Sequence, residues 1–419
     1  MSGLPLLLAS LLAFQQTASG GPHRIAPDIW QSRGIGHVHL VATPEGNVVI
    51  DTGLFLQADH HRRVLGAVTS EPARYVVLTH AHADHASGVG PWVGGDTTII
   101  AHARFPQTQR YLYELAPFQT RRNRIYYPGV IPASTSAEAS RAMLPQVEPD
   151  LLVRDVNAFE LGGTRFEVIA TPGAEGADSV SVWLPDRRIL FTGDFLGPIF
   201  PMWPNLYSLR GETIRSATDY IDSLDRVIAL EPEMLVPSHG EPVEGAQTIR
   251  SNLERIRDAV RYVHDAVVDG MNEGRTVHEL MRDIRLPPEL HLPEPHGKLS
   301  WGVRAIWEGY AGWFHGRSTT DLYPVAASDV YGDIAVLAGG AGPIVTAAEQ
   351  HLDGLLPLHA LHLVEIALAA HPDHLGALRV RLTALERLLE DSGGENFFER
   401  MWLTHRIVAT RERIGELER

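Results

Sequence analysis

At 419 residues the chain can hold two or three domains, and its 44% hydrophobic and 21% charged residues are ordinary for a globular protein. The net charge of −15 argues against a general nucleic-acid binder, which needs a basic surface. Cysteine is absent, which excludes disulfides and leaves His, Asp and Glu as the side chains that can hold a metal.

The N-terminal run at 4–14 is apolar but too short to span a bilayer. It suits the hydrophobic region of a secretory signal, although no Lys or Arg precedes it. Residues 1–24 are therefore interpreted either as a signal peptide of an exported, periplasmic or secreted protein, or as an N-terminal helix of a cytoplasmic one. No later segment is apolar enough to be transmembrane, so no stable membrane insertion is expected.

The next part of the chain alternates between strand and helix patterns. Two strands are expected at 37–53 around a Thr-Pro-Glu-Gly turn, then a helix at 57–70, on which His60 and His61 are expected to be solvated. Further apolar strands are expected at 75–78, 166–173, 179–184, 189–194 and 234–240. This alternation predicts a layered α/β fold, and the polar groups that follow the strands lie where function is usually placed.

The remainder reads mainly as helix. An insert rich in Arg and Tyr occupies 102–155, helices are expected at 246–270, 277–285 and 301–316, and a linker at 316–324. From Ala326 onward apolar residues recur at heptad-like spacing, which predicts helical hairpins that resemble tetratricopeptide units. The predicted domains are 25–317 and 318–419. The second carries no catalytic cluster, so packing or dimerisation is its expected role.

The stretch THAHADH (79–85) packs three histidines and an aspartate into six residues after an apolar strand. Buried without partners, these groups would be costly, so a metal site is the favoured interpretation. On an extended segment His80 and His82 face one side, while Asp84 and His85 can face a second centre. Imidazole and carboxylate without thiolate suit zinc, with iron or manganese as lesser options.

Five signals occur in an order that resembles the metallo-β-lactamase superfamily: DTG (51–53), HxHxDH (80–85), TPG (171–173), TGD (192–194) and SHG (238–240). The resemblance implies an αββα sandwich with two zinc ions at one edge, followed here by an all-α domain of helical hairpins. It further implies the ligands, namely His80 and His82 for one metal, Asp84, His85 and His239 for the other, and Asp194 as the bridge. Asp51 would orient a ligand histidine from behind.

The common pattern has a histidine directly after TPG, whereas this chain has Ala174 and then Glu175. Either one metal is lost, or Glu175 replaces the imidazole. Glutamate reaches further than aspartate, and carboxylate is an accepted zinc ligand. The alkylsulfatase branch makes the same replacement, so the resemblance narrows toward it and implies that Glu175 completes the first metal site.

The segment PNLYSLRGE (204–212) resembles the alkylsulfatase segment in which an Asn and an Arg hold the sulfate, here Asn205 and Arg210. An arginine fork suits a tetrahedral oxyanion. The segment 121–130 resembles the branch's Arg- and Tyr-rich loop over the site, without a unique alignment for Tyr126 and Tyr127. The terminal helices resemble its dimerisation domain, which implies a homodimer.

The resemblance therefore implies an enzyme that hydrolyses alkyl sulfate esters with a metal-bound hydroxide. The catalytic candidates are Asp84, Asn205 and Arg210, and we expect Phe200, Trp203 and Pro204 to line the path of the alkyl chain.

Two departures leave alternatives open. Asp194 stands where alkylsulfatases tend to carry glutamate, and His239 lies in a Ser-His-Gly context rather than their His-His-Trp-Pro. Both features favour the general hydrolases of the superfamily, so a carboxylic ester, lactone, thioester or β-lactam is the alternative substrate. A catalytically silent scaffold that dimerises through its helices is the third interpretation.

Overall fold

The computed structural model describes residues 20–128, 131, 135–144, 146–173 and 175–419. The chain forms two compact units, one ending at Gly309 and the other running from Tyr310 to Arg419. The segment considered for a signal peptide lies almost wholly outside the described residues, as does Ala174. The domain boundary at 317/318 stays a prediction.

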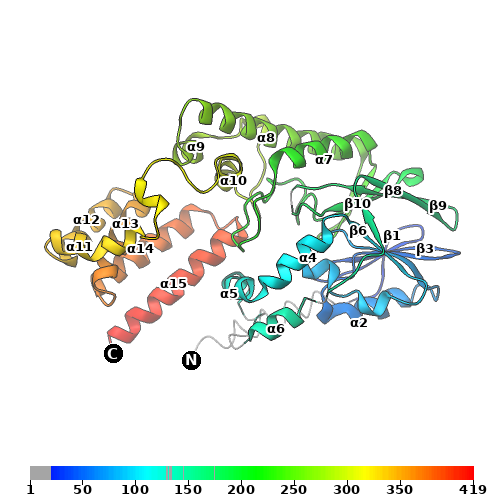
Figure 1. The fold of residues 1–419 in the computed structure, drawn as a ribbon, viewed down its shortest axis with the longest axis horizontal. Helices are drawn as coiled ribbons and strands as arrows, with labels where there is room; N and C mark the ends of the chain where they lie inside the picture. The colour runs from blue at the N-terminus through cyan, green and yellow to red at the C-terminus, as the bar shows by residue number, and fades with distance from the viewer. Residues whose placement is uncertain (1–19, 129–130, 132–134, 145, 174) are drawn as a thin grey trace. The chain divides into compact units, whose positions relative to one another are not determined.

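The first unit contains two sheets (Figure 1). One is built, in spatial order, from β1 (His23–Ala26), β2 (Ile29–Ser32), β3 (Val38–Thr43), β4 (Gly46–Ile50), β5 (Ala73–Val77), β6 (Thr98–His102) and β7 (Leu151–Val153). The other is built from β13 (Val243–Glu244), β12 (Met234–Pro237), β11 (Ile189–Gly193), β10 (Val180–Leu184), β9 (Thr164–Ala170) and β8 (Val156–Leu161).

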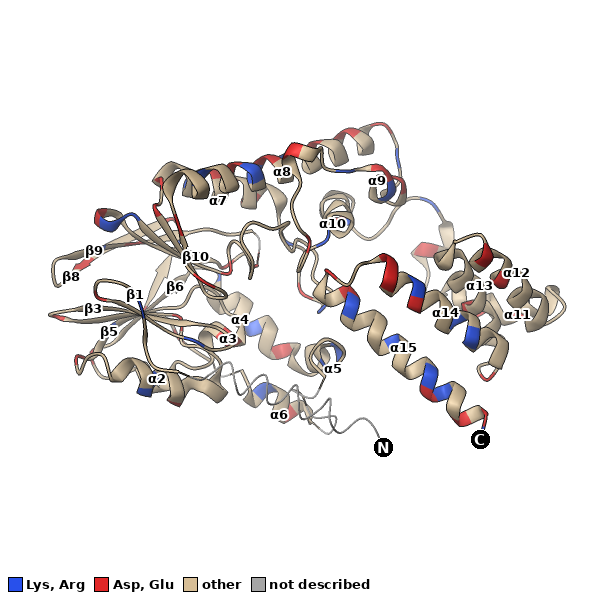
Figure 2. Cartoon of the chain, turned by 180° about the vertical axis from the view of Figure 1, so that it is seen from behind, with Lys and Arg blue, Asp and Glu red and all other residues tan. Residues whose placement is uncertain are grey.

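The two sheets pack face to face through a core of buried aliphatic and aromatic residues, among them Ile50 and Val77 on one side and Phe166 and Phe191 on the other. Helix α2 (Ala58–Gly66) and helix α4 (Phe105–Glu114) cover the outer face of the first sheet. The second sheet is covered by α7 (Ala217–Leu230) and α8 (Ala246–Asn272), as Figure 1 shows. Figure 2 shows the charges gathered mainly on helices and loops, away from the strands. This is the expected αββα sandwich.

Polar motifs converge because strands of both sheets end at one edge. In the first sheet β4, β5 and β6 run parallel, and in the second β11 and β12 do. At this edge the backbone N–H of Val180 donates to the carbonyl of Thr79, which joins the two sheets at a distance of 2.8 Å. The loops that follow β4, β5, β9, β11 and β12 therefore meet.

Among the described residues, the first unit also contains the α-helices α3 (Ala83–Ala86), α5 (Ala116–Tyr126), α6 (Ala137–Ala142) and α9 (Val277–Asp283), and α10 (Leu299–Ala311) runs across its C-terminal boundary. The second unit contains α11 (Tyr331–Leu337), α12 (Ala341–Asp353), α13 (Pro357–Ala370), α14 (Leu375–Asp391) and α15 (Phe397–Leu417). From α12 onward each of these helices packs on the next. In the described chain no single helix is long and apolar enough to cross a membrane, although 327–337 and 341–353 meet that test together as a pair bent by 103°.

Two expectations need correction. The segment 121–130, which resembles a loop over the site, is helical as far as Tyr126, where α5 ends. His61 is buried rather than solvated, with Nδ1 2.8 Å from Oγ of Ser32. Helix α2 buries Ala58, His61 and Leu65, which share its inner face at helical spacing, so of two adjacent histidines only His60 is left partly exposed.

The buried state of His61 predicts acid sensitivity. Burial, then His60 and His37, lower the pKa of His61 to about 3. An unfolded chain takes up this proton near pH 6.5 and the folded chain does not, so the free energy of unfolding falls as pH drops from 6.5 toward 3. The slope for one such proton is about 1.4 kcal/mol per pH unit.

Urea unfolding between pH 7 and 4 measures this slope. His61→Gln is expected to reduce it by about that amount, whereas the exposed His23→Gln is expected to leave it unchanged. Equal slopes for His61→Gln and the natural sequence would show that His61 does not carry the effect.

Candidate metal centre

The sequence motifs lie at the ends of the converging strands. Asp51 follows β4, the histidine-rich segment follows β5 and enters the short helix α3, and Asp194 and His239 follow β11 and β12. Glu175 lies in the loop after β9. The structure therefore brings together all seven predicted ligands and Asp51; their roles as ligands stay predictions.

Asp51 is fully buried and ties these loops to one another. Its Oδ1 accepts a hydrogen bond from the backbone N–H of Thr79 at 2.8 Å. Its Oδ2 lies 2.9 Å from Thr79 Oγ1, 2.9 Å from His85 Nδ1 and 2.8 Å from Ser238 Oγ. A carboxylate only accepts hydrogen bonds, so His85 donates from Nδ1, which leaves the lone pair of Nε2 to coordinate a metal.

His80 is oriented through the same carboxylate. Its Nδ1 lies 3.1 Å from Thr79 Oγ1, whose own proton goes to Asp51. His80 therefore presents Nε2 to the site, 2.8 Å from Nδ1 of His82. Ligand atoms of His80, His82 and Asp194 all lie within 4.8 Å of one another, which is a spacing that one ion can bridge.

Asp84, His85 and His239 form a second such group. Nε2 of His239 lies 3.5 Å from Asp84 and 3.3 Å from Oδ1 of Asp194, while Nε2 of His85 lies 3.4 Å from Oδ2 of Asp194. Nε2 of His85 and Oδ1 of Asp194 are buried and have no hydrogen-bond partner in the part of the chain that the structure describes. Atoms this close around one point are spaced as the ligands of one ion would be, and Asp194 reaches both groups.

The charges of this cluster favour a cation. Burial lowers the pKa of His85, but the carboxylates of Asp194, Asp84 and Asp51 outweigh burial and raise it well above its ordinary value. Burial likewise opposes ionisation of Asp194, yet His239 and His85 hold its pKa well below its usual range. Without a metal, protonated histidines balance the charge of these carboxylates. A divalent cation can supply that positive charge instead, so the donor set fits a metal.

His82, a further predicted ligand, also has a carboxylate behind it. His82 points Nδ1 toward His80, and its Nε2 lies 3.6 Å from Oε2 of Glu212. Ligand histidines generally donate their outer N–H to such an acceptor. Glu212 belongs to the segment 204–212, in which the sequence pattern indicated only Asn205 and Arg210.

Glu175 lies beside the first group, with Oε2 4.0 Å from Nδ1 of His82. Its carboxylate is buried and paired with Arg215, whose nitrogens lie 2.9 and 3.0 Å from its oxygens. Burial raises the pKa of Glu175, and Arg215 and Arg210 offset this only in part. Glu175 is thus within reach of an ion held by His80 and His82, with Arg215 fixing it from the other side.

The candidate sulfate-binding residues lie next to this centre. Arg210 lies 3.0 Å from Glu212 and 3.7 Å from Glu175. Asn205 is buried, and its side-chain Nδ2 has no hydrogen-bond partner among the described residues. Of the two tyrosines, Tyr127 lines the same cavity as Arg210, while Tyr126 donates to the carbonyl of Leu209 at 3.3 Å.

The cavity beside the centre has a volume of about 290 Å³. Its polar end contains His82, Asp84, Arg210 and Glu212, and its apolar wall includes Leu54, Phe55, Leu56, Ala116, Met143 and Leu144. The expectation that Trp203 lines such a path is corrected, because its side chain is wholly buried in the core against Gly302 of α10.

Arg215 and His296 are further residues that the sequence did not assign to the site. Nε2 of His296 lies 3.8 Å from Glu175. Both come from segments outside the motifs, before α7 and before α10, and only the fold reveals their proximity.

Two motif glycines are explained by close packing at the site. Gly193 has φ 55°, and a Cβ there would lie 2.7 Å from the side chain of Thr79, the residue that joins Asp51 to His80. Gly173 has φ 134°, and a Cβ would lie 2.6 Å from the backbone of Tyr220 in α7. Glycine alone permits both the backbone conformation and the approach.

Models of known protein families match both parts of the chain. Residues 32–239 match the family model of the metallo-beta-lactamase superfamily, and residues 276–404 match the model for alkyl sulfatase dimerisation. The chain therefore contains a metallo-β-lactamase domain followed by an alkyl sulfatase dimerisation domain.

Similar curated proteins include two alkylsulfatases of Pseudomonas sp. A linear primary-alkylsulfatase is 28% identical over 339 residues, which cover 75% of this chain and 63% of that protein. An (R)-specific secondary-alkylsulfatase is 25% identical over 401 residues, which cover 88% of this chain and 59% of that protein. The chain thus spans about three fifths of the length of these relatives.

The solved structure of the stereoselective inverting sec-alkylsulfatase Pisa1 from Pseudomonas sp. superimposes with a TM-score of 0.79. The match covers 98% of this chain and 68% of that chain at 23% identity. At this identity the likeness establishes the fold.

The hydrogen bonds of Asp51 predict that Asp51→Asn weakens metal binding about 10- to 100-fold, because an amide cannot accept at all these positions and no longer fixes His85. Metal content after dialysis against a chelator, measured by mass spectrometry, tests this. Ser238→Ala removes one of the hydrogen bonds and is expected to lose far less metal. Unchanged metal retention in Asp51→Asn would contradict the orienting role.

Proposed function

We propose that this protein is a dinuclear zinc hydrolase that cleaves alkyl sulfate esters. The observation that carries the proposal is one cavity in which a metal-type cluster, an arginine and an apolar wall meet. When bound, two zinc ions would supply an activated water and positive charge at the sulfate. His80, His82, Glu175 and Asp194 would hold one ion, and Asp84, His85, His239 and Asp194 the other.

The residues next to the metal cluster suit a sulfate monoester. Arg210 offers a planar fork of donors, and the free amide N–H of Asn205 offers another, both to oxygens of a tetrahedral anion. Held in advance by the protein, such donors stabilise charge that grows in the transition state. Tyr127 lines the same cavity as Arg210.

A buried network keeps these donors in place. Arg215 is 3% exposed at its side chain, is paired with both Glu175 and Glu212, and donates to the backbone carbonyl of Asn205 at 2.6 Å. Glu212 in turn holds Arg210 at 3.0 Å. A metal ligand and both sulfate-binding residues therefore share one set of ion pairs and hydrogen bonds, which fixes the anion site relative to the metals.

The apolar wall suits the alkyl part of the substrate. Each methylene that leaves water for such a surface contributes about 0.8 kcal/mol. Longer alkyl sulfates are therefore expected to bind more tightly until the wall is filled.

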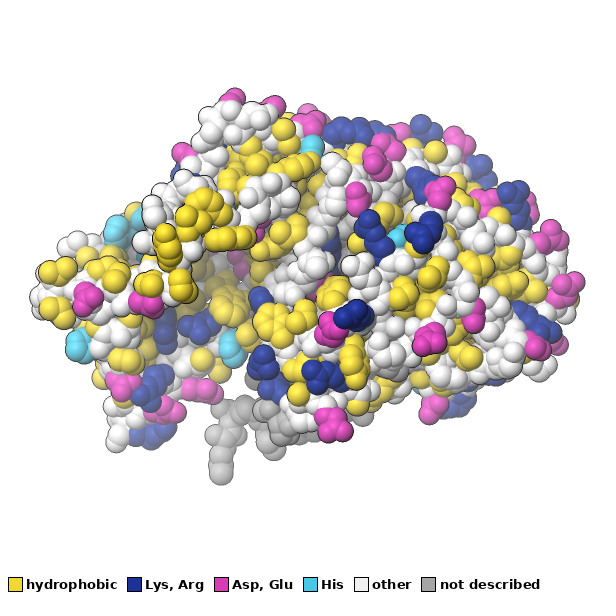
Figure 3. Space-filling view, viewed as in Figure 1, with side chains coloured by type: hydrophobic (Ala, Val, Ile, Leu, Met, Phe, Trp, Pro, Cys, Tyr) yellow, Lys and Arg dark blue, Asp and Glu magenta, His cyan; other side chains and the backbone are white. Residues whose placement is uncertain are grey.

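We also propose a homodimer formed through the second unit. Its surface exposes large apolar side chains, of which Val336, Leu337 and Leu355 are 78%, 87% and 78% exposed. Figure 3 shows apolar atoms spread over its surface. Apolar patches of this kind often mark contacts with another protein chain.

The substrate proposal predicts release of inorganic sulfate from dodecyl sulfate by zinc-loaded protein. Arg210→Ala is expected to lower kcat/KM about 100-fold or more, since it removes a donor to the developing charge. Arg210→Lys should retain only part of kcat/KM, because lysine keeps the positive charge but lacks the planar fork of N–H donors. Sulfate release is measured by ion chromatography.

The exposed Arg121→Ala on α5 is the matched control and should retain activity. No sulfate release by metal-loaded protein, together with turnover of a lactone, thioester, carboxylic ester or β-lactam, would replace this proposal by the alternative substrate class.

The role of Glu175 predicts that Glu175→Ala binds one equivalent of zinc where the natural sequence binds two. Glu175→Gln preserves a hydrogen bond to Arg215 and so separates metal loss from misfolding. Elemental analysis alongside circular dichroism tests both, with the exposed Glu160→Ala as control. Two equivalents and full activity in Glu175→Gln would show that Glu175 is not a ligand.

A further inference from the structure

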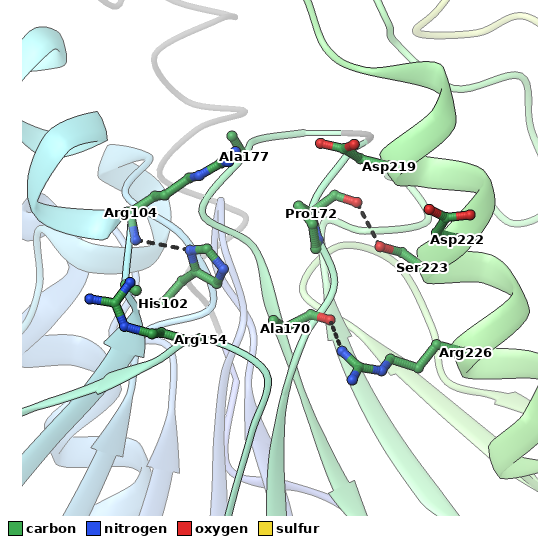
Figure 4. A pocket seen from close by; sticks show the side chains of 11 residues that line it. His102, Arg104, Arg154, Ala170, Pro172, Ala177, Asp219, Asp222, Ser223 and Arg226 are labelled. Carbon is green, nitrogen blue, oxygen red and sulfur yellow. Dashed lines mark hydrogen bonds between the residues drawn. The ribbon is translucent and has the colours of Figure 1, made fainter.

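A second cavity, of about 570 Å³, lies between the ends of β6 and β9 and helix α7 (Figure 4). It is separate from the metal centre. The loop after β9 divides the two, because Pro172 and Ala177 line the cavity while Glu175 contacts His82 and Asp178 accepts from the backbone N–H of Ala81 on the other side.

One wall of the cavity is cationic. It contains Arg104 and Arg154, and neither guanidinium makes a hydrogen bond or ion pair with another residue in the described ranges. Between them lies His102, which is 6% exposed and accepts the backbone N–H of Arg104 at Nδ1, at 3.0 Å. Burial, then Arg104 and Arg154, lower the pKa of His102 to about 4, so its imidazole is neutral and its other ring nitrogen carries a proton to donate.

The opposite wall is acidic. Asp219 and Asp222 of α7 face the cavity across from the arginines, and the structure gives their carboxylates no ion pair within the described chain. Two hydrogen bonds join α7 to the end of β9 at this cavity, from Ser223 to the carbonyl of Pro172 at 2.8 Å and from Arg226 to the carbonyl of Ala170 at 3.0 Å. Opposite charges thus line one cavity, and no ion pair joins them within the described chain.

We propose that this cavity is a second ligand site, which binds a small dipolar molecule with an oxyanion at one end and an ammonium group at the other. Arg104, Arg154 and His102 receive the oxyanion through charge-assisted hydrogen bonds. Asp219 and Asp222 receive the ammonium. A volume of this size lies within the range of small-molecule sites. The site does not depend on the hydrolase activity proposed above.

The test uses ω-aminoalkyl phosphates of increasing chain length, with alkyl phosphates and alkylamines of the same lengths as controls. Isothermal titration calorimetry on zinc-loaded protein is expected to show saturable binding of an aminoalkyl phosphate. The alkyl phosphates and alkylamines should bind at least about tenfold more weakly than the aminoalkyl phosphate, since each lacks one of the two charge-assisted contacts.

Variants locate the binding. Arg104→Ala/Arg154→Ala is expected to weaken binding at least about tenfold. The double variant Asp219→Asn/Asp222→Asn is expected to bind aminoalkyl phosphates no more tightly than alkyl phosphates of the same length. The exposed Arg63→Ala is the matched control, and Arg210→Ala, which alters the metal-side cavity, should leave binding unchanged.

Absence of saturable binding by every aminoalkyl phosphate would overturn the proposal. Binding that survives Arg104→Ala/Arg154→Ala and is lost in Arg210→Ala would also overturn it, because the probe would then occupy the metal centre. Melting temperatures of all variants check that each is folded.

Discussion

The buried carboxylate of Asp51 accepts hydrogen bonds from two segments of one sheet edge and from the loop after β12 of the other. It orients His85 directly and His80 through Thr79. A charge buried this deeply would be expensive without these donors, so the loops and the carboxylate depend on one another. The two-sheet edge is thereby fixed in the conformation that points both histidines at a common region.

A second network joins the metal region to the anion site. Glu175 and Glu212 are both paired with Arg215, and Glu212 also reaches His82 and Arg210. Such buried pairs add little net stability compared with apolar packing, but removing one member leaves the others uncompensated. Their value lies in geometry, because one arginine ties a candidate ligand to the residues proposed to bind sulfate.

Much of this centre could be predicted because its residues lie in short motifs at strand ends. The spacing of His80, His82, Asp84 and His85 fixes their grouping locally, and the strand order brings Asp194 and His239 to them. Glu212, Arg215 and His296 contribute single polar side chains from irregular segments, so only tertiary packing shows their positions.

The same distinction holds for the fold. The apolar runs predict β5, β9, β10, β11 and β12, but they do not predict β6, although it is equally buried. Helix α5 was not predicted either, because its buried residues include Gln119 and Thr120 and its polar sequence lacks apolar periodicity. Trp203 was placed near the substrate from its neighbours in sequence. In the structure its indole instead packs against α10, which no local pattern indicates.

The central claim is that Glu175 completes a two-metal site in place of a histidine. Crystals of zinc-loaded protein, measured at the zinc absorption edge, test it most directly. We expect two anomalous peaks, one contacted by His80, His82, Glu175 and Asp194 and the other by Asp84, His85, His239 and Asp194. A single peak, or two peaks with Glu175 bound only to Arg215, would contradict it.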